Sequence, residues 1–229
     1  NKKIRIDTPV QQDMKISGIM NFLNYPKIQF EKFAVCYGSQ ICNFTGNSTS
    51  SNLNVDLEGK ALDSSVLTDI FDLPFDMSGN IDIKLKASGE ISKPYITCSL
   101  NSKNGEIHGI PYDNFNVNLN AKNNTLNINE FKIQKKDEYT AKITGFFPFW
   151  IDPELKNQMM NKKVDVRYEL IDTKLTTLKS LTKDIIETKK GNLKLEGILS
   201  GTRKNISNTG NLTVTAANLV TDSYIHKIK

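Results

Sequence analysis

The most constraining feature of this sequence is a stretch, residues 79–145, in which apolar and polar residues alternate one by one. Three runs carry the alternation most strictly: Ile81–Ala87, Phe115–Ala121 and Leu126–Asn129. A period of two places the apolar side chains on one face of a β-strand and the polar side chains on the other. The stretch therefore predicts an antiparallel sheet with one apolar face and one solvated face.

Length and charge narrow the class of protein. The 229 residues allow one large or two small domains, and the net charge of +5 comes from 30 basic and 25 acidic residues spread along the chain. Without a block of like charge or a basic stripe with aromatic residues, nucleic-acid binding is disfavoured. The sequence has no run of 18 apolar residues and no signal peptide. Because it starts at Asn1 and stops at Lys229 within a pattern, we expect a piece of a longer protein.

The rest of the chain adds strands and short helices. Weaker alternation predicts strands at residues 13–20, 28–36, 41–46, 53–58, 164–170, 191–200 and 210–216. Apolar residues at helical spacing predict short amphipathic helices over Leu62–Phe71, with Asp63 or Ser64 as N-cap, and over Leu175–Ile186. A third helix is expected from Asp152 to about Asn161. The aromatic cluster Phe146–Trp150 is interpreted as a plug packed under the sheet, with a partner or membrane contact as the alternative.

Three cysteines do not form a disulfide framework. Cys36 and Cys42 lie at equal distance from Ser39. If residues 37–41 form a hairpin turn, the two cysteines sit opposite each other and a disulfide is geometrically allowed. Two small, reduced and buried side chains are the favoured interpretation.

The chain also repeats itself at a shift of 112 residues without a gap. Gly79-Asn80 matches Gly191-Asn192, and Ser88-Gly89 matches Ser200-Gly201. We interpret the chain as one continuous domain of two units, about 28–145 and about 146–229, the second truncated. Stacked units predict a mainly β fold, an elongated curled antiparallel sheet in which about 14 strands spaced by about 4.8 Å form a groove about 65 Å long. A closed sandwich is the alternative, because it also needs one apolar face per sheet.

The order of strand, short Leu-rich helix and glycine-bounded strands resembles the AsmA-like/TamB family of bacterial envelope proteins. The resemblance rests on the glycine and apolar spacing of Ser78–Pro94, Gly105–Phe115 and Thr144–Pro148 and covers roughly residues 21–229. The second unit departs from it, because Arg203–Ser207 lacks the proline and Asp222-Ser223 replaces the earlier Ile-Pro pair.

This resemblance implies a location and a function. Members of the family are anchored in the inner membrane by an N-terminal helix, which would precede Asn1, and cross the periplasm as a long taco-shaped β-groove. They are implicated in moving phospholipids to the outer membrane. TamB is also implicated in outer-membrane protein assembly with a barrel partner, which engages a C-terminal part outside this chain. Phospholipids are therefore the expected partners.

An acyl chain needs a dry strip of apolar side chains, and the alternating strands supply one. We expect the following residues to line the groove: Ile81, Ile83, Leu85, Ala87, Phe115, Val117, Leu119, Leu126, Ile128, Ile133, Ile143, Val166, Tyr168, Leu193 and Leu195. Four apolar residues of the predicted helices are expected to cap its open side: Leu67, Ile70, Leu178 and Leu181.

Catalytic and metal-binding signatures are missing from the sequence. His108 and His226 have no Cys or carboxylate at ligand spacing, and no nucleophile elbow or phosphate-binding loop occurs. Asp137-Glu138 is interpreted as a solvated loop. We therefore predict no enzyme activity, no metal and no cofactor. Two alternatives to a lipid conduit stay open: a scaffold for outer-membrane protein assembly by β-augmentation, and a closed structural β-solenoid or sandwich.

Overall fold

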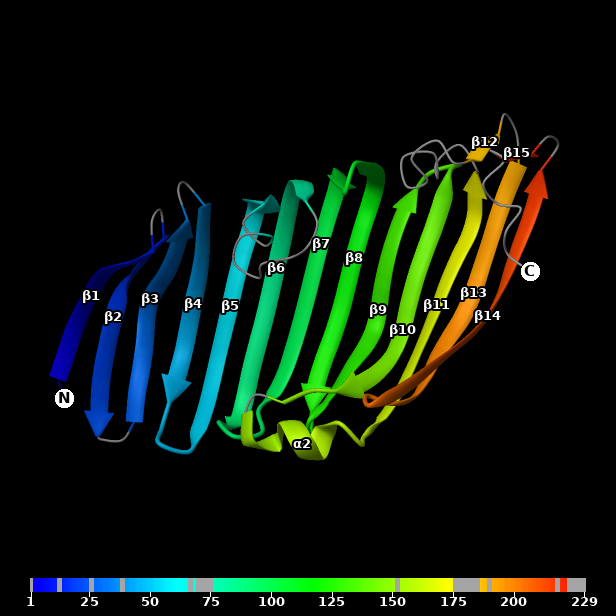
Figure 1. The fold of residues 1–229 in the computed structure, drawn as a ribbon. Helices are drawn as coiled ribbons and strands as arrows, with labels where there is room; N and C mark the ends of the chain where they lie inside the picture. Colours follow the sequence, from blue (N-terminus) through cyan, green and yellow to red (C-terminus); the bar gives the residue numbers. More distant parts are fainter. Residues whose placement is uncertain are drawn as a thin grey trace.

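The computed structural model describes residues 2–11, 14–24, 27–37, 40–65, 68, 76–150, 153–174, 186–188, 191–216 and 219–221. Its main feature is one antiparallel sheet of 13 strands (Figure 1). The prediction of a mainly β fold built on an antiparallel sheet is confirmed.

The strands of the main sheet are long and similar in length. Their bounds are β1 Lys2–Gln11, β2 Met14–Asn24, β3 Lys27–Tyr37, β4 Gln40–Ser48, β5 Asn52–Asp63, β6 Met77–Glu90, β7 Tyr95–Ile107, β8 Ile110–Lys122, β9 Thr125–Lys135, β10 Tyr139–Pro148, β11 Lys163–Lys174, β13 Gly191–Thr202 and β14 Asn205–Ala216. The remaining elements are η1 Pro153–Leu155, α2 Lys156–Met159, β12 Ile186–Thr188 and β15 Leu219–Thr221.

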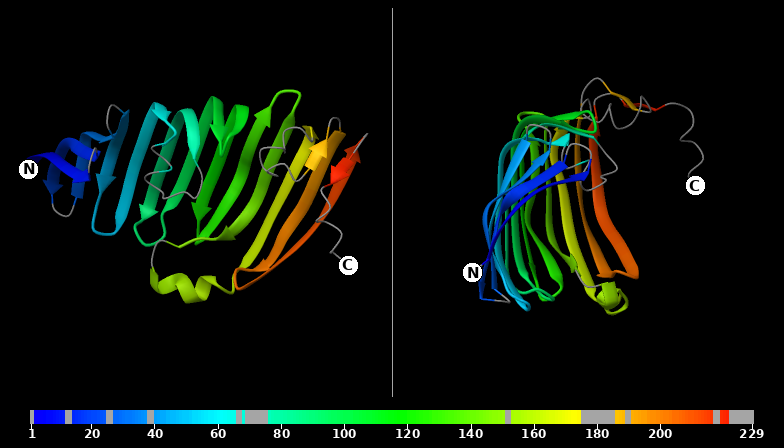
Figure 2. Two further views of the ribbon diagram at one scale, coloured as in Figure 1. Left: turned by 45° about the horizontal axis from the view of Figure 1, so that its top comes forward. Right: turned by 90° about the vertical axis from the view of Figure 1, so that its left-hand side faces the viewer.

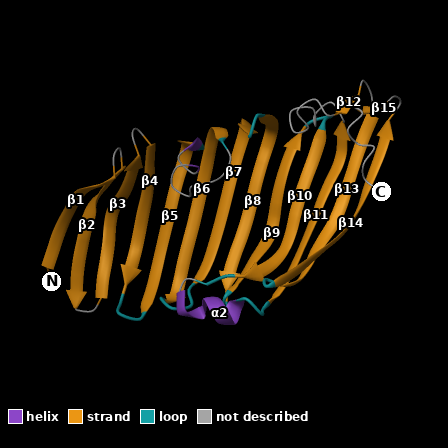
Figure 3. Ribbon diagram, in the orientation of Figure 1, coloured by secondary structure: helices purple, strands orange, loops and turns teal. Residues whose placement is uncertain are grey.

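The sheet is a meander. Each of its strands pairs with the strand before it in the chain, except that β13 pairs with β11, while β12 and β15 form a separate two-stranded sheet. Figures 2 and 3 show the main sheet as a single twisted layer, with α2 beside the ends of the central strands. In the described part of the chain no second large sheet packs on this layer, so the sandwich alternative is wrong there.

Two-residue turns close the central hairpins. Asn123 and Asn124 join β8 to β9 with φ angles of 51° and 58°. His108 and Gly109, with φ angles of 51° and 75°, join β7 to β8. Positive φ at both central positions is typical of the type I′ turn, whose twist matches that of the flanking strands. His108 is therefore accounted for as a turn residue.

Strand β6 shows the predicted alternation clearly. Ile81, Ile83 and Ala87 are buried, whereas Asp82 and Lys84 are exposed. Directly paired residues of neighbouring strands lie on the same face, so each side chain of the sheet can be assigned to one side. We call the side that carries Ile81 the apolar face and the side that carries Asp82 the polar face.

The polar face of β8 and β9 carries a chain of asparagine hydrogen bonds. Asn127 Nδ2 donates to Asn120 Oδ1 at 2.9 Å, and Asn120 Nδ2 donates to Asn129 Oδ1 at 3.0 Å. Asn129 Nδ2 in turn donates to Asn118 Oδ1 at 3.2 Å. The asparagine-rich composition of this stretch thus links two strands on their solvated side.

The predicted helices are not confirmed. Leu62 and Asp63 end strand β5, but Asp63 Oδ1 accepts a hydrogen bond from Ser65 N at 3.0 Å, as predicted for an N-cap, and Ser65 and Thr68 are helical. Residues 66–67, 69–71 and 175–185 of the predicted helices lie outside the described residues, and Ile186 begins β12. The helix expected to reach Asn161 is reduced to η1 and α2, three and four residues long. The predicted capping residues lie outside the described residues: Leu67, Ile70, Leu178 and Leu181.

The alternative that Cys36 and Cys42 sit opposite each other is wrong by one position in register, whereas the favoured interpretation of two reduced thiols agrees with the structure. Cys36 pairs with Ile41 and Cys42 pairs with Val35, so the two cysteines lie on opposite faces of the β3–β4 hairpin. The turn is one residue shorter than a turn centred on Ser39, because Tyr37 pairs directly with Gln40. Both thiols are free.

Gly145→Ala tests whether strands β10 and β11 approach each other closely at this glycine, and Gly89→Ala is the matched control. Both glycines have positive φ, 134° and 97°. A Cβ at position 145 would collide with Asp165 O and lie 2.7 Å from Val166 Cα, whereas at position 89 it would meet nothing within 4 Å. We expect Gly145→Ala to lower the free energy of unfolding by about 3 kcal/mol or more and Gly89→Ala by about 1 kcal/mol.

Urea denaturation of the two variants measures this difference. If both variants lost the same free energy of unfolding, the positive φ angle alone would explain the loss at Gly145, and the close contact between β10 and β11 would be absent.

Candidate functional site

The apolar face is built from rows of side chains that cross the strands. Because paired residues share a face, each row follows the long direction of the sheet. One row runs from β6 to β11 and consists of Ile83, Leu100, Val117, Phe131, Ile143 and Tyr168. Its neighbour runs from β5 to β13 and consists of Leu57, Leu85, Cys98, Leu119, Ile128, Gly145, Val166 and Leu199.

Two further rows flank these. One extends from β5 to β14 through Leu62, Ile81, Ser102, Phe115, Ile133, Ala141, Leu170, Leu195 and Leu212. The other extends from β5 to β10 through Val55, Ala87, Ile96, Ala121, Leu126 and Phe147. Leu193 lies opposite Thr173 and Val214 on the same face. The structure thus brings all fifteen predicted lining residues onto one face.

Exposure changes along this face. In the centre of the sheet Ile81 is 0% exposed and Phe115 4%, because the side chains of adjacent strands pack against each other. At the β14 end Ile206 is 52% exposed, Leu212 62% and Val214 44%. The apolar face is therefore a packed hydrophobic cluster in the middle and an open apolar surface at its β14 end.

The packed centre includes residues that sequence reasoning missed. Tyr112 is 1% exposed, and its ring lies over Gly105 on the paired strand, where a Cβ would collide with the tyrosine hydroxyl. The buried Ser102 Oγ donates to Asn80 O at 2.6 Å and lies 2.8 Å from Tyr112 Oη. These bonds satisfy the polar groups inside an apolar environment, as burial requires.

Tyr168 repeats this arrangement further along the sheet. It pairs with Gly197, where a Cβ would again collide with the tyrosine hydroxyl. Its hydroxyl donates to Asn208 Oδ1 at 2.8 Å and so bridges from β11 across β13 to β14. A tyrosine lying over a cross-strand glycine fills the space that the glycine leaves in the apolar face.

Aromatic rings also cover the apolar face near the N-terminal strands. Phe33, 8% exposed, contacts Phe30 and Phe44 with ring centroids 5.4 and 6.2 Å apart, and Phe30 and Phe44 lie 5.3 Å apart. These rings meet edge to face, the geometry that aromatic pairs favour.

The cluster Phe146–Trp150 does not form a single plug. Phe146 pairs with Asp165 on the polar face, while Phe147 pairs with Leu126 on the apolar face. The Arg203 guanidinium lies 4.2 Å from the centroid of the Trp150 ring, a cation–π contact that joins the β13–β14 turn to the segment before η1.

The thiols of Cys42 and Cys98 belong to the apolar face. Cys98 pairs with Leu85 and Leu119, and burial raises the pKa of its thiol. Burial also raises the pKa of the Cys42 thiol, and the neighbouring Cys36 raises it further. Since both groups favour the protonated form, they behave as small apolar side chains.

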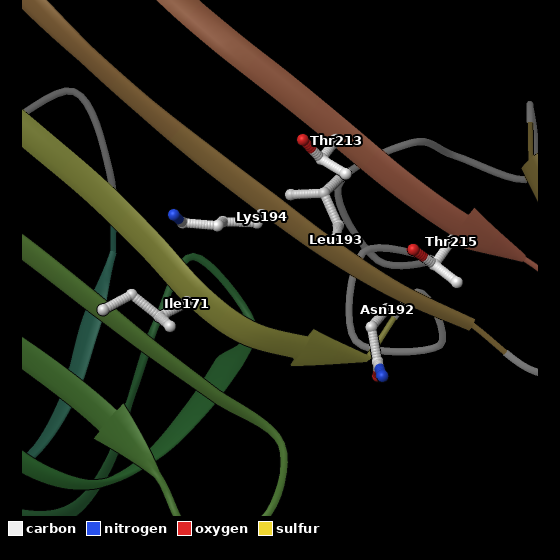
Figure 4. Close-up of a pocket in the computed structure, with 6 residues that line it drawn as sticks. All are labelled: Ile171, Asn192, Leu193, Lys194, Thr213 and Thr215. Carbon is white, nitrogen blue, oxygen red and sulfur yellow. The ribbon is translucent and has the colours of Figure 1, made fainter.

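A separate depression of about 120 Å³ lies between β11, β13 and β14 (Figure 4). Four of its six lining residues are polar: the lining consists of Ile171, Asn192, Leu193, Lys194, Thr213 and Thr215. Lys194 Nζ donates to Glu196 Oε2 at 2.8 Å, a bond that raises the pKa of Lys194 and lowers that of Glu196. The depression is too small and polar to extend the apolar rows.

Other kinds of site find little support in the described ranges. There, no three His, Cys, Asp or Glu side chains gather to hold a metal ion, and no helix is long and apolar enough to cross a bilayer. Asp137 and Glu138 lie in the β9–β10 turn, as predicted. Comparison of the chain with protein families, curated proteins and solved structures finds no match.

Because side-chain exposure rises from the centre of the sheet to β14, we expect alanine substitutions at two positions of the same row to lower the free energy of unfolding by very different amounts. Ile81→Ala removes a fully buried side chain and should lower the free energy of unfolding by about 2–5 kcal/mol. Leu212→Ala, at 62% exposure, should cost less than about 1 kcal/mol. Chemical denaturation of both variants checks this. A loss for Leu212→Ala as large as that for Ile81→Ala would show that the β14 end is covered in solution.

Proposed function

We propose that the apolar face binds the acyl chains of phospholipids and that the protein is a segment of a lipid-conducting bridge between the inner and outer membranes of a bacterial envelope. The observation that carries the proposal is the set of mainly apolar rows, which cross up to nine successive strands of a single-layered sheet and are interrupted at Ser102 and Gly145.

The direction of the rows suits a long apolar ligand. Twelve strand spacings of about 4.8 Å give the sheet a length of about 58 Å, and the furrows between rows follow that length. An acyl chain that lies in a furrow gains about 0.8 kcal/mol for each methylene removed from water. Because these contacts need no directed hydrogen bonds, a chain can slide from strand to strand. In this proposal the strands curl around the ligand as a groove.

Recurring backbone features support the proposed repeat of two units. Strand β5 carries an extra residue opposite Ile81 and Ile83, and β11 carries an extra residue opposite Leu193 and Leu195. The strand positions opposite the two β-bulges are therefore 112 residues apart, as in the sequence repeat, whereas the bulged segments of β5 and β11 are 111 residues apart.

Two glycines occupy equivalent strand positions, although they are 99 residues apart and not 112. Gly46 in β4 has a φ of 142° and pairs with Val55, while Gly145 in β10 has a φ of 134° and pairs with Val166. A Cβ on either glycine would collide with a carbonyl oxygen of the next strand. On this evidence we align β4–β7 with β10, β11, β13 and β14, an alignment that starts the second unit at β10, a few residues before the boundary of about 146 that the sequence predicts.

The resemblance to the AsmA-like/TamB family supplies the proposed setting. Under this proposal the chain lies in the periplasm, a membrane anchor outside this sequence holds it at the inner membrane, and phospholipids are its ligands. The proposal includes no catalytic residue, metal or cofactor.

Leu119→Asp and Asn118→Asp test lipid binding as a matched pair. These neighbours on β8 point to opposite faces, and both changes add one negative charge. A carboxylate at position 119 would be desolvated by a bound acyl chain, so we expect Leu119→Asp to abolish lipid crosslinking to a photoreactive residue at position 128, which pairs with Leu119. Asn118→Asp should leave crosslinking unchanged.

Crosslinked and co-purified lipid is measured by mass spectrometry, and circular dichroism establishes that both variants are folded. Equal crosslinking in folded Leu119→Asp, or absence of lipid from the unmodified protein, would contradict the proposal.

A further inference from the structure

One long side of the main sheet, formed by the ends of its strands, carries a cluster of basic residues. The cluster consists of Lys156 in α2, Lys162 and Lys163 where β11 begins, and Arg203 and Lys204 in the β13–β14 turn. All five residues are exposed. Figure 1 shows α2 and the β13–β14 turn at the same ends of the strands. We call these five residues the basic edge.

Backbone hydrogen bonds hold the two parts of the basic edge together. Lys204 N donates to Met160 O at 3.0 Å, and Arg203 N donates to Lys162 O at 3.4 Å. The Arg203 guanidinium also lies 4.2 Å from the centroid of the Trp150 ring. An arginine oriented in this way keeps N–H donors at its edge, and their fork geometry matches the oxygens of a phosphate group.

Few carboxylates balance the basic edge. Within the described residues none of its five side chains forms an ion pair. The acidic residues of the β10–β11 connection are Glu154 and Asp152, of which Asp152 lies outside the described residues. Asp165, on the same face of β11 as Lys163, forms an ion pair with Arg167 at 3.7 Å. The basic edge therefore carries a net positive charge.

The β9–β10 turn, at the opposite ends of the strands, has a different charge balance. It carries Lys135 and Lys136, but Lys135 Nζ donates to Asp113 Oδ1 at 3.0 Å, and Lys136 N donates to Asp113 Oδ2 at 2.7 Å. These two hydrogen bonds lower the pKa of Asp113, so its carboxylate stays charged. Asp137 and Glu138 follow in the same turn. Carboxylates therefore accompany the lysines there, in contrast to the basic edge.

The basic edge borders the apolar face. Val164, which follows Lys163 directly, is 7% exposed and pairs with Gly201 on the apolar face. Arg203 follows Gly201 by two residues. A phospholipid combines the same two elements, because an apolar chain adjoins a negatively charged phosphate group.

We propose that the basic edge binds the headgroup phosphate of a phospholipid whose acyl chain lies on the apolar face, and that it selects anionic over zwitterionic phospholipids. The inference rests on the proposed function, because the acyl chain brings the headgroup to this edge. The ammonium group of a zwitterionic headgroup is repelled by the lysines, whereas an anionic headgroup carries no such group. A single exposed ion pair contributes up to about fivefold in affinity.

The test offers the chain, residues 1–229, vesicles of equal phosphatidylglycerol and phosphatidylcholine with identical acyl chains. Lipid bound to the reisolated protein is quantified by mass spectrometry. We expect phosphatidylglycerol to be enriched about fivefold over the vesicle composition, and Lys162→Gln combined with Lys204→Gln to reduce the enrichment below about twofold. Lys103→Gln combined with Lys136→Gln is the control, because both lysines are exposed near the opposite strand ends and the change in charge is equal.

Salt provides a second measurement that needs no substitution. In 1 M salt the screening length is about 3 Å, so the enrichment in the unmodified chain should disappear. Bound lipid in the vesicle ratio, an enrichment that survives Lys162→Gln with Lys204→Gln or 1 M salt, or an equal loss in the control would overturn the inference and leave acyl-chain binding standing. Binding of neither lipid would contradict the proposed function and this inference together.

Discussion

The structure depends on the backbone hydrogen-bond register between neighbouring strands. This register places the alternating apolar side chains of every strand on the same face of the sheet. A slip of one residue would move every apolar side chain of a strand to the opposite face. In this sheet the bulges opposite Ile81–Ile83 and Leu193–Leu195 absorb local irregularities without changing the face that later residues occupy. The apolar rows persist across the strands for this reason, and the polar face can be solvated along its length.

The register places the apolar side chains on one face, but it does not decide whether other side chains cover that face or leave it exposed. Around β5–β9 the side chains nearest Ile81 are closely packed, with Tyr112 over Gly105 and Leu62 against Ile81. The adjacent row through Cys98 and Leu119 is partly exposed. Towards β14 the same alternation leaves large apolar groups exposed, because in the described part of the chain β14 has a neighbouring strand on one side only. The proposed lipid binding draws on the apolar area of this face that is partly exposed among the described residues.

The sequence predicted the strands in which apolar and polar residues alternate strictly. It did not predict a strand in which small or polar residues occupy positions on the apolar face. Strand β6 was evident, but β7 was not, because its apolar-face positions include Cys98 and Ser102. Ser102 is tolerated there through its bonds to Tyr112 and Asn80, which no local pattern reveals. The fifteen residues predicted to line a groove share one face of the sheet, whereas the gradient of exposure along that face depends on neighbours that periodicity does not identify. The β3–β4 register was missed because one fewer residue in the turn changes every pair by one position.

The native thiols allow the most direct test of an apolar face that is accessible to acyl chains. Cys98 lies on the apolar face between Leu85 and Leu119, and Cys36 lies on the polar face opposite Ile41. A fluorophore is attached to each thiol in turn, with the other two cysteines replaced by serine, and phospholipid with brominated acyl chains is added. The account predicts quenching of the Cys98 label and none of the Cys36 label; equal quenching at both positions, or none at Cys98, would contradict it.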